Sequence, residues 1–95
     1  MNGDNSNVVF IGQKPFMNYV TYVALGFTAQ NADEVIVKAR GKLISRAVDV
    51  VEVAANRFLD NSVNVTDVKI GSENCKNKEG KDVRVSFIEI TLKKK

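Results

Sequence analysis

The chain has 95 residues, which is enough for one hydrophobic core but too few for two independently folded domains. Apolar residues make up 44% of it and charged residues 26%, a composition that excludes wholesale disorder. There is no histidine and a single cysteine, which excludes histidine-based general base catalysis, Cys/His zinc sites and internal disulfides. We therefore expect a protein that is not an enzyme and that needs no metal or cofactor.

The composition and the first residues indicate a protein of the cytoplasm. The sequence has no run of about 18 apolar residues that could span a membrane as a helix. Residues 1–7 are polar and carry an acid where a signal peptide has basic and then apolar residues. The lone Cys75 lies among Lys, Asn and Glu, which is typical of a reducing compartment. We expect residues 1–7 to form a flexible tail and residues 8–95 to form a single domain.

The first half of the chain predicts a strand, a helix and a second strand. Val8–Ile11 is a short apolar run ended by Gly12, as is typical of a buried strand. Pro15 suits the first turn of a helix, and apolar side chains at helical spacing extend that helix over residues 15–29. Residues 34–39 are rich in β-branched side chains and predict the second strand.

The second half predicts a helix over residues 43–59 and two strands, over residues 63–70 and 83–92. A polar and charged segment between these strands, residues 71–80, is expected to form a long hairpin tip. The apolar alternation shifts phase once in each strand, at Val65–Val68 and at Phe87–Ile88. Such a shift is typical of a β-bulge or of a strand that is buried on both faces. The element order is therefore β-α-β-α-β-β.

The helix over residues 43–59 carries more apolar surface than one sheet can cover. A stripe that includes Val51 faces one side, and further apolar residues lie outside that stripe. A helix that is apolar over this much of its circumference needs cover on a second side. Since the domain is small and has only one other helix, we expect a second copy of the chain to supply this cover, with Val51 at the dimer interface.

Basic residues lie at the two turns that lead from a strand into a helix. The first basic turn, residues 12–15, contains Lys14, and the second, residues 38–42, contains Arg40 and Lys42; neither contains an acid. If the two strands are parallel and joined by a right-handed crossover, both turns emerge at the same edge of the sheet. Each begins a helix whose N-terminal N–H groups favour an anion. The three cations are therefore expected to converge on one anion-binding patch.

The hairpin is a second basic feature. From residue 69 to residue 84, five basic residues stand against three acidic ones, a net charge of +2. On an extended arm beside the basic turns, such residues can follow a polyphosphate backbone. The residues expected to bind phosphate there are Lys76, Lys78, Lys81 and Arg84.

Charge alone leaves two kinds of function open. Basic turns beside a basic arm are typical of nucleic-acid binding. Most surface lysines, however, only solvate a protein, so a plain protein-interaction domain also fits these residues. The aromatic Phe58, near the end of the second helix, is more typical of a core residue than of an interface residue.

Three spaced motifs resemble a known family. They are Val9–Tyr19 (VFIGQKPFMNY), Val37–Asp49 (VKARGKLISRAVD) and Ala55–Leu59 (ANRFL). In colinear order from about residue 8 to residue 95, the chain resembles the Alba family of archaeal chromatin proteins. The resemblance implies an α+β two-layer sandwich: a four-stranded mixed sheet, two helices on one face and an extended β-hairpin arm. It also implies a homodimer that binds double-stranded DNA with little sequence preference, and often RNA, with the two hairpin arms along the minor groove.

The motifs carry the family's functional positions onto this chain. Its lysine pair before proline falls on Gln13 and Lys14, so the first position, which is acetylated in the family, is an uncharged glutamine here. Its two arginines around glycine fall on Arg40 and Lys42, and Lys42 lacks the bidentate guanidinium fork. Duplex binding is therefore expected to be weaker than in a relative with the lysine pair. The aromatic position through which family dimers contact one another on DNA falls on Phe58, with Asn56 and Arg57 beside it at the same interface.

These observations together predict a non-catalytic, largely sequence-independent double-stranded DNA-binding protein of archaeal chromatin. We expect a homodimer, associated with the chromosome, that coats, compacts or bridges DNA. One alternative is an RNA-binding protein or ribonucleoprotein accessory subunit that uses the same patch. Another is a low-abundance regulator with some sequence preference.

Overall fold

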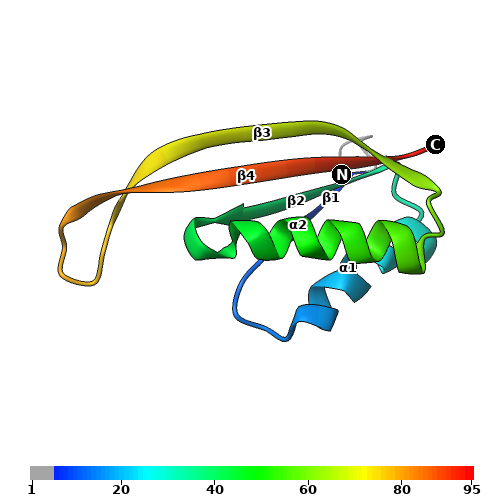
Figure 1. The fold of residues 1–95 in the computed structure, drawn as a ribbon, viewed down its shortest axis with the longest axis horizontal. Helices are drawn as coiled ribbons and strands as arrows, with labels where there is room; N and C mark the ends of the chain where they lie inside the picture. The colour runs from blue at the N-terminus through cyan, green and yellow to red at the C-terminus, as the bar shows by residue number, and fades with distance from the viewer. Residues whose placement is uncertain (1–5) are drawn as a thin grey trace.

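The body of the molecule is a four-stranded mixed sheet with two helices packed on one of its faces (Figure 1). The structure is a computed structural model, and it describes residues 6–95. Its elements are β1 (Ser6–Phe10), α1 (Phe16–Thr28), β2 (Glu34–Arg40), α2 (Ile44–Val53), β3 (Val63–Lys76) and β4 (Asp82–Lys94). The strand order is β1-β2-β4-β3, with β1 and β2 parallel and the other neighbours antiparallel. This arrangement confirms the expected α+β fold. Within these residues no helix is long and apolar enough to cross a membrane.

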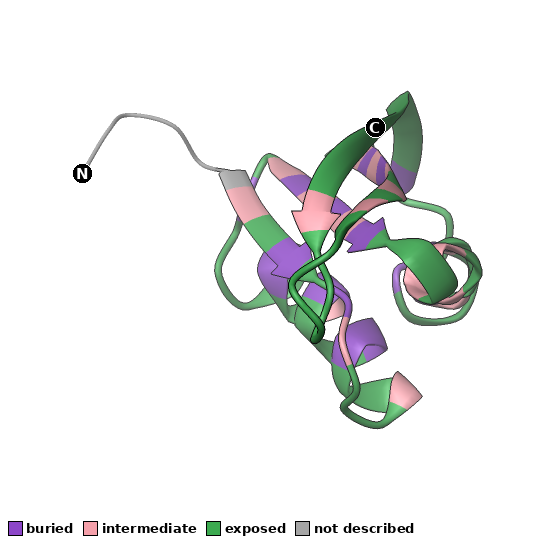
Figure 2. Cartoon of the chain, turned by 90° about the vertical axis from the view of Figure 1, so that its left-hand side faces the viewer, coloured by how far each residue is buried: buried purple, intermediate pink, exposed green. Residues whose placement is uncertain are grey.

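The core lies between the sheet and the helices (Figure 2). On β2, Val35, Val37 and Ala39 are buried, whereas the residues between them are only half-buried. From α1, Val20 and Val23 are fully buried. Strand side chains alternate between faces and helix side chains recur every three to four residues, so the apolar pattern also determines which face of each element packs inward.

The first strand begins two residues earlier than expected. Ser6 and Asn7 were expected in the tail, but they pair with Glu34 and Val35 in the parallel ladder. Ladder pairing uses backbone groups, so it extends a strand past its apolar run. The rest of the expected tail, residues 1–5, lies outside the described residues.

The helical segments match the expected ranges in part. The helix expected over residues 15–29 occurs as α1, one residue shorter at each end. The prediction of a single α-helix over residues 43–59 is wrong in detail. A 3₁₀ turn, Gly41–Leu43, precedes α2, and a π-helical turn, Ala54–Phe58, follows it. Gly41 has a φ of +60°, which glycine adopts without strain, so the chain passes directly from β2 into the 3₁₀ turn.

The hairpin arm is longer than its sequence indicates. Residues 71–80 were expected to form its tip, but the ladder continues to the pair of Lys76 with Asp82, and only residues 77–81 connect the two strands. On β3, every side chain beyond the first residue is exposed except that of Cys75, which is half-buried. A strand in contact with water on both faces has no apolar alternation, so the sequence gives no strand signal there.

The two phase shifts in the apolar alternation have different causes. In β3 the register against β4 shifts between Val65 and Asp67, which confirms an irregularity at the expected place. At Phe87–Ile88 the ladder is unbroken. Since successive strand residues point to opposite faces, Ile88 is buried under the helices and Phe87 is half-buried on the other face. Apolar residues on both faces explain this second shift.

Candidate nucleic-acid interface

The two basic turns lie at the same edge of the sheet. The parallel pairing of β1 with β2 brings the ends of both strands together, and the Ile11 N–H donates to the Lys38 carbonyl oxygen at 2.9 Å beyond the last strand pair. From the first turns of α2, the Arg46 guanidinium donates to the Lys14 carbonyl oxygen at 3.2 Å. This contact joins the first basic turn to the helix that the second basic turn begins.

A buried tyrosine holds the first basic turn in place. The Tyr19 hydroxyl accepts hydrogen bonds from the backbone N–H groups of Gly12 and Lys14, each at 2.9 Å. Only 3% of Tyr19 is exposed, so this oxygen is an anchor inside the fold. The Lys14 ammonium donates to the Tyr22 hydroxyl at 3.4 Å and lies 5.5 Å from the centre of that ring. Gln13 is exposed between these fixed points.

The second basic turn carries an ion-paired arginine and an exposed lysine. The Arg40 guanidinium forms an ion pair with the Glu73 carboxylate of β3 at 2.8 Å, and its Nη1 lies 3.6 Å from the Cys75 sulfur. Lys42 is exposed in the 3₁₀ turn. Arg40 therefore meets an internal carboxylate at the position where a phosphate was expected.

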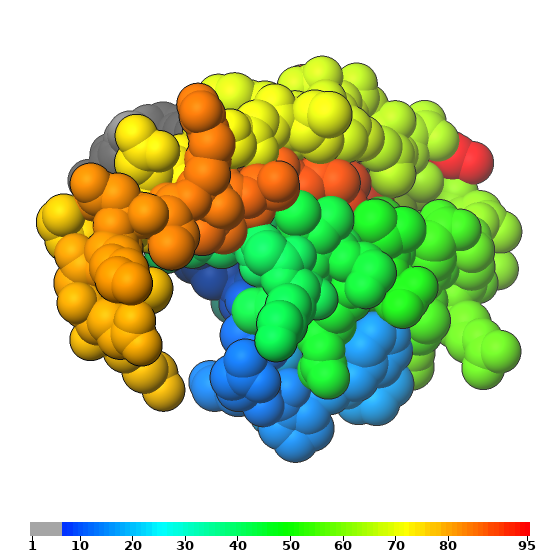
Figure 3. Space-filling view, turned by 60° about the vertical axis from the view of Figure 1, so that its left-hand side comes forward, coloured from blue at the N-terminus to red at the C-terminus, as the bar shows by residue number. Residues whose placement is uncertain are grey.

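The arm carries its cations to the same end of the molecule as the start of α2 (Figure 1). Lys76 pairs with Asp82 at 2.7 Å, and the Arg84 Nε donates to the Ser72 hydroxyl at 3.2 Å. Lys78 and Lys81 are exposed in the connecting turn. In the space-filling view, a hollow separates the end of the arm from the body near the first basic turn (Figure 3).

An apolar groove runs between α2 and the sheet. It has a volume of about 210 Å³ and is lined by Val48, Val51, Glu52, Val65, Val68, Ile88 and Ile90. Val51, the residue expected at the dimer interface, is only 3% exposed and forms part of the groove floor within one subunit. Val48 and Val68 are 42% and 52% exposed along the same groove. The apolar surface left uncovered beside the middle of α2 thus belongs to the groove rim.

The residues expected at dimer–dimer contacts lie on the π-helical turn, at the end of α2 away from the basic turns. Asn56 and Arg57 are exposed, and Phe58 is 52% exposed. Phe58 is therefore not a core residue, contrary to the expectation from its residue type. Among residues 6–95, no group of three or more His, Cys, Asp or Glu side chains could hold a metal ion.

Two residues that hold the cations or basic turns in place were missed by reasoning from the sequence. Tyr19 has the spacing of a core residue on α1, and nothing in its neighbours marks its two backbone hydrogen bonds. Glu73 lies 33 residues from Arg40, and their contact depends on β4, which lies between β2 and β3 in the sheet. No local sequence signal identifies either role.

Comparison with known proteins defines the class of this α+β chain. The family model of Alba matches residues 7–72. The chain is 48% identical over 86 residues to the DNA/RNA-binding protein Alba of Methanococcus maripaludis, covering 90% of this chain and 96% of that protein. The chain therefore belongs to the Alba family, as its three motifs predicted.

Solved structures agree with this assignment. The chain superposes on Alba from Thermoplasma volcanium with a TM-score of 0.85 and 41% identity, over 93% of this chain and all of that one. It also matches ALBA1 from Trypanosoma brucei with a TM-score of 0.72 and 25% identity, over 93% of this chain and 68% of that one.

Proposed function

We propose that this chain is a non-catalytic protein that binds double-stranded DNA with little sequence preference and coats, compacts or bridges the chromosome in the cytoplasm. The observation that carries the proposal is the meeting of the two basic turns at one edge of the sheet, beside a projecting basic arm. A similar protein carries the name DNA/RNA-binding protein Alba, which supports a nucleic acid as the ligand.

Binding would take place mainly through phosphates. Lys14 and Lys42 present exposed ammonium groups at helix beginnings, where N–H groups and the helix dipole also favour an anion. Lys78 and Lys81 present theirs from the end of the arm. Contacts of this kind position a protein on a duplex but carry no sequence information, so they support sequence-tolerant binding.

The active form is proposed to be a homodimer assembled through the groove between α2 and β3. The rim valines, Val48 and Val68, leave a nearly continuous apolar surface beside the buried floor. A second copy of the chain would cover it and would place a second pair of basic turns on the same DNA. Phe58, together with Asn56 and Arg57, is proposed to serve a separate contact between dimers.

The Lys14→Ala, Arg40→Ala double variant tests this proposal. We expect the slope of log affinity against log salt to become shallower by about one to two per bound subunit, since the Lys14 contact is lost together with the contact that Arg40 makes when a phosphate displaces Glu73. Anisotropy titrations of a short duplex at several salt concentrations measure it. A Lys94→Ala, Lys95→Ala variant removes the same charge at the other end of the sheet and serves as the control. Affinity that stays within about twofold in a folded Lys14→Ala, Arg40→Ala protein would refute the proposed site.

RNA is the second candidate ligand, because the similar protein from Methanococcus maripaludis is named as binding both DNA and RNA. An RNA-binding protein or ribonucleoprotein subunit would use the same cations, since both duplexes offer phosphates. Competition between matched DNA and RNA duplexes at fixed salt separates the two. A preference for the DNA duplex supports the primary proposal. A preference for the RNA duplex contradicts it and supports the RNA-binding alternative.

A further inference from the structure

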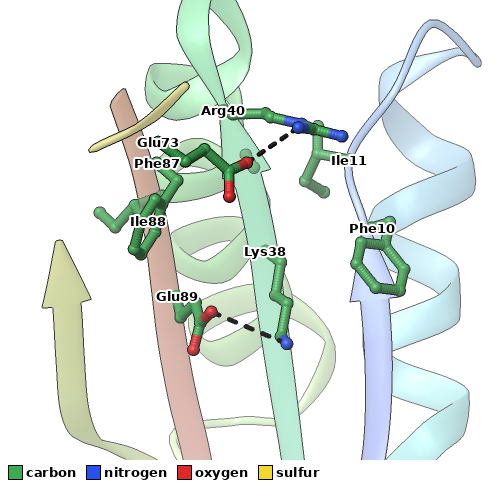
Figure 4. Close-up of a pocket in the computed structure, with 9 residues that line it drawn as sticks. Phe10, Ile11, Lys38, Arg40, Glu73, Phe87, Ile88 and Glu89 are labelled. Atoms are coloured by element: carbon green, nitrogen blue, oxygen red, sulfur yellow. Dashed lines mark hydrogen bonds and ion pairs between the residues drawn. The ribbon is translucent and has the colours of Figure 1, made fainter. Parts of the chain in front are cut away.

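The face of the sheet that carries no helices, here called the open face, contains a pocket with aromatic walls (Figure 4). Its volume is about 350 Å³. Phe10 of β1 and Phe87 of β4 form apolar walls, and Phe10 is 70% exposed. Around them stand two cations and two carboxylates, contributed by Lys38, Arg40, Glu73 and Glu89. An aromatic ring this exposed, on a strand inside a charged rim, has no role in the core.

The two aromatic rings differ in how they are held. The Phe87 ring lies over Gly71 of the neighbouring strand, where an added Cβ would lie 2.7 Å from the ring. Glycine at position 71 thus leaves room for this ring and fixes its place on the sheet. The Phe10 ring is approached by the Lys38 ammonium at 5.8 Å from its centre, and its outer surface is free. The pocket therefore has one fixed aromatic wall and one accessible ring.

The charges around the pocket balance each other. Lys38 pairs with Glu89 at 3.7 Å and Arg40 pairs with Glu73 at 2.8 Å. A phosphate group entering here would meet two carboxylates, so the pocket does not suit a sugar-phosphate backbone. A neutral ligand with donors and acceptors on its edge suits it better: the carboxylates accept from amino groups, and the cations donate to carbonyl oxygens and ring nitrogens.

A flat aromatic ligand with such an edge is a nucleobase. We propose that the open-face pocket binds one unpaired base of an RNA, stacked on Phe10, while the neighbouring basic turns hold the phosphates. Arg40 lines the pocket and also belongs to the second basic turn, so the two sites are continuous. RNA is the expected source because its loops and bulges present unstacked bases, whereas a paired duplex keeps its bases stacked inside. The inference rests on the proposed nucleic-acid binding and adds to it a site for single-stranded segments.

The test compares two RNAs that share one stem, of which one has a single-nucleotide bulge and the other is fully paired. We expect the protein to bind the bulged RNA about fivefold more tightly or better, the range that stacking one base on an aromatic side chain supports. Phe10→Ala should abolish this preference, and Phe10→Tyr should restore it because the ring is retained. Val8→Ala, on the same face of the same strand but outside the pocket, is the control and should keep the preference.

A second readout reports stacking directly. With 2-aminopurine at the bulge, fluorescence should fall on binding to the original protein and to Phe10→Tyr, but not to Phe10→Ala. A preference that survives Phe10→Ala overturns the proposal, and so does an equal preference for a bulged DNA duplex. If the original protein binds neither RNA, the proposal is overturned too, whereas binding to a paired DNA duplex tests the proposed function separately. Since Phe10 is exposed, its variants should fold, and thermal melting checks this.

Discussion

The Arg40 guanidinium donates a 2.8 Å hydrogen bond to the Glu73 carboxylate and thereby connects the end of β2 to the arm. Both side chains are about half exposed, at 61% and 48%, so the ion pair adds at most about 1 kcal/mol to stability. Its effect on binding is of more consequence. A phosphate that reaches Arg40 must compete with a carboxylate already in place.

Replacing that carboxylate should strengthen duplex binding. In Glu73→Gln, Arg40 is released for phosphate, and we expect affinity to rise by up to about fivefold, the equivalent of one exposed ion pair. Anisotropy titrations at low salt measure this. Glu79→Gln removes the same charge from the turn of the arm without touching Arg40, and it should raise affinity less. Equal gains from both variants would mean that net charge, and not the ion pair, sets the affinity.

Restoring a lysine at position 13 should add a phosphate contact. Gln13 is exposed beside Lys14 in a turn fixed by Tyr19, so the new ammonium would lie beside the existing one. We expect Gln13→Lys to steepen the slope of log affinity against log salt by up to about one per bound subunit. Ser62→Lys adds the same charge at the other end of the molecule and should leave the slope nearly unchanged. An unchanged slope in Gln13→Lys would show that this position does not face phosphate.

A charge on the groove rim should separate the proposed dimer. Val68 is 52% exposed, so Val68→Lys leaves the monomer core intact while placing an ammonium in the apolar contact. Sedimentation should then show monomer at concentrations where the original chain is dimeric. Leu25→Lys, at an exposed position on α1, is the matched control and should remain dimeric. Val51→Lys is a poor probe of the interface, because Val51 is buried within the subunit and a lysine there should unfold it.

The Tyr19 hydroxyl should stabilise the fold as well as position the first basic turn. Tyr19→Phe leaves the Gly12 and Lys14 N–H groups without their acceptor. Since water can reach part of this turn, we expect a loss of about 1–2 kcal/mol in the free energy of unfolding, measured by urea denaturation. Tyr22→Phe removes an exposed hydroxyl whose contact is the 3.4 Å approach of Lys14, and it should cost much less. Equal losses would show that the two backbone hydrogen bonds to Tyr19 add no more stability than the Lys14 contact with Tyr22.

The body of the fold could be predicted from local pattern. The alternation of Val35, Val37 and Ala39 defines the inner face of β2, and the helical spacing of Val20 and Val23 defines that of α1. These patterns are visible in the sequence because one side of each element is buried in the core and the other side is more exposed to solvent. The meeting of the two basic turns also followed, since parallel strands joined by a right-handed crossover end at the same edge.

The length of the arm could not be predicted in this way, because neither of its faces is buried. From about residue 66 to residue 76 it is in contact with water on both faces, so backbone pairing holds it and no apolar period marks its length. Phe58 was misjudged by residue type, since an aromatic side chain near a helix end is usually buried and this one is exposed. Val51, expected at the dimer interface, lies on the floor of the groove within one subunit.

Thus the order of apolar and polar residues was sufficient to determine the sequence of strands and helices, the inner faces of β2 and α1, and the edge at which the cations gather. The partners of those cations came only from the tertiary structure. Glu73 reaches Arg40 across β4, Tyr19 reaches back to its turn, and Phe10 and Phe87 line one pocket on the open face. Each of these arrangements joins residues whose proximity is set by strand register and packing, and such proximity has no periodic signature along the chain.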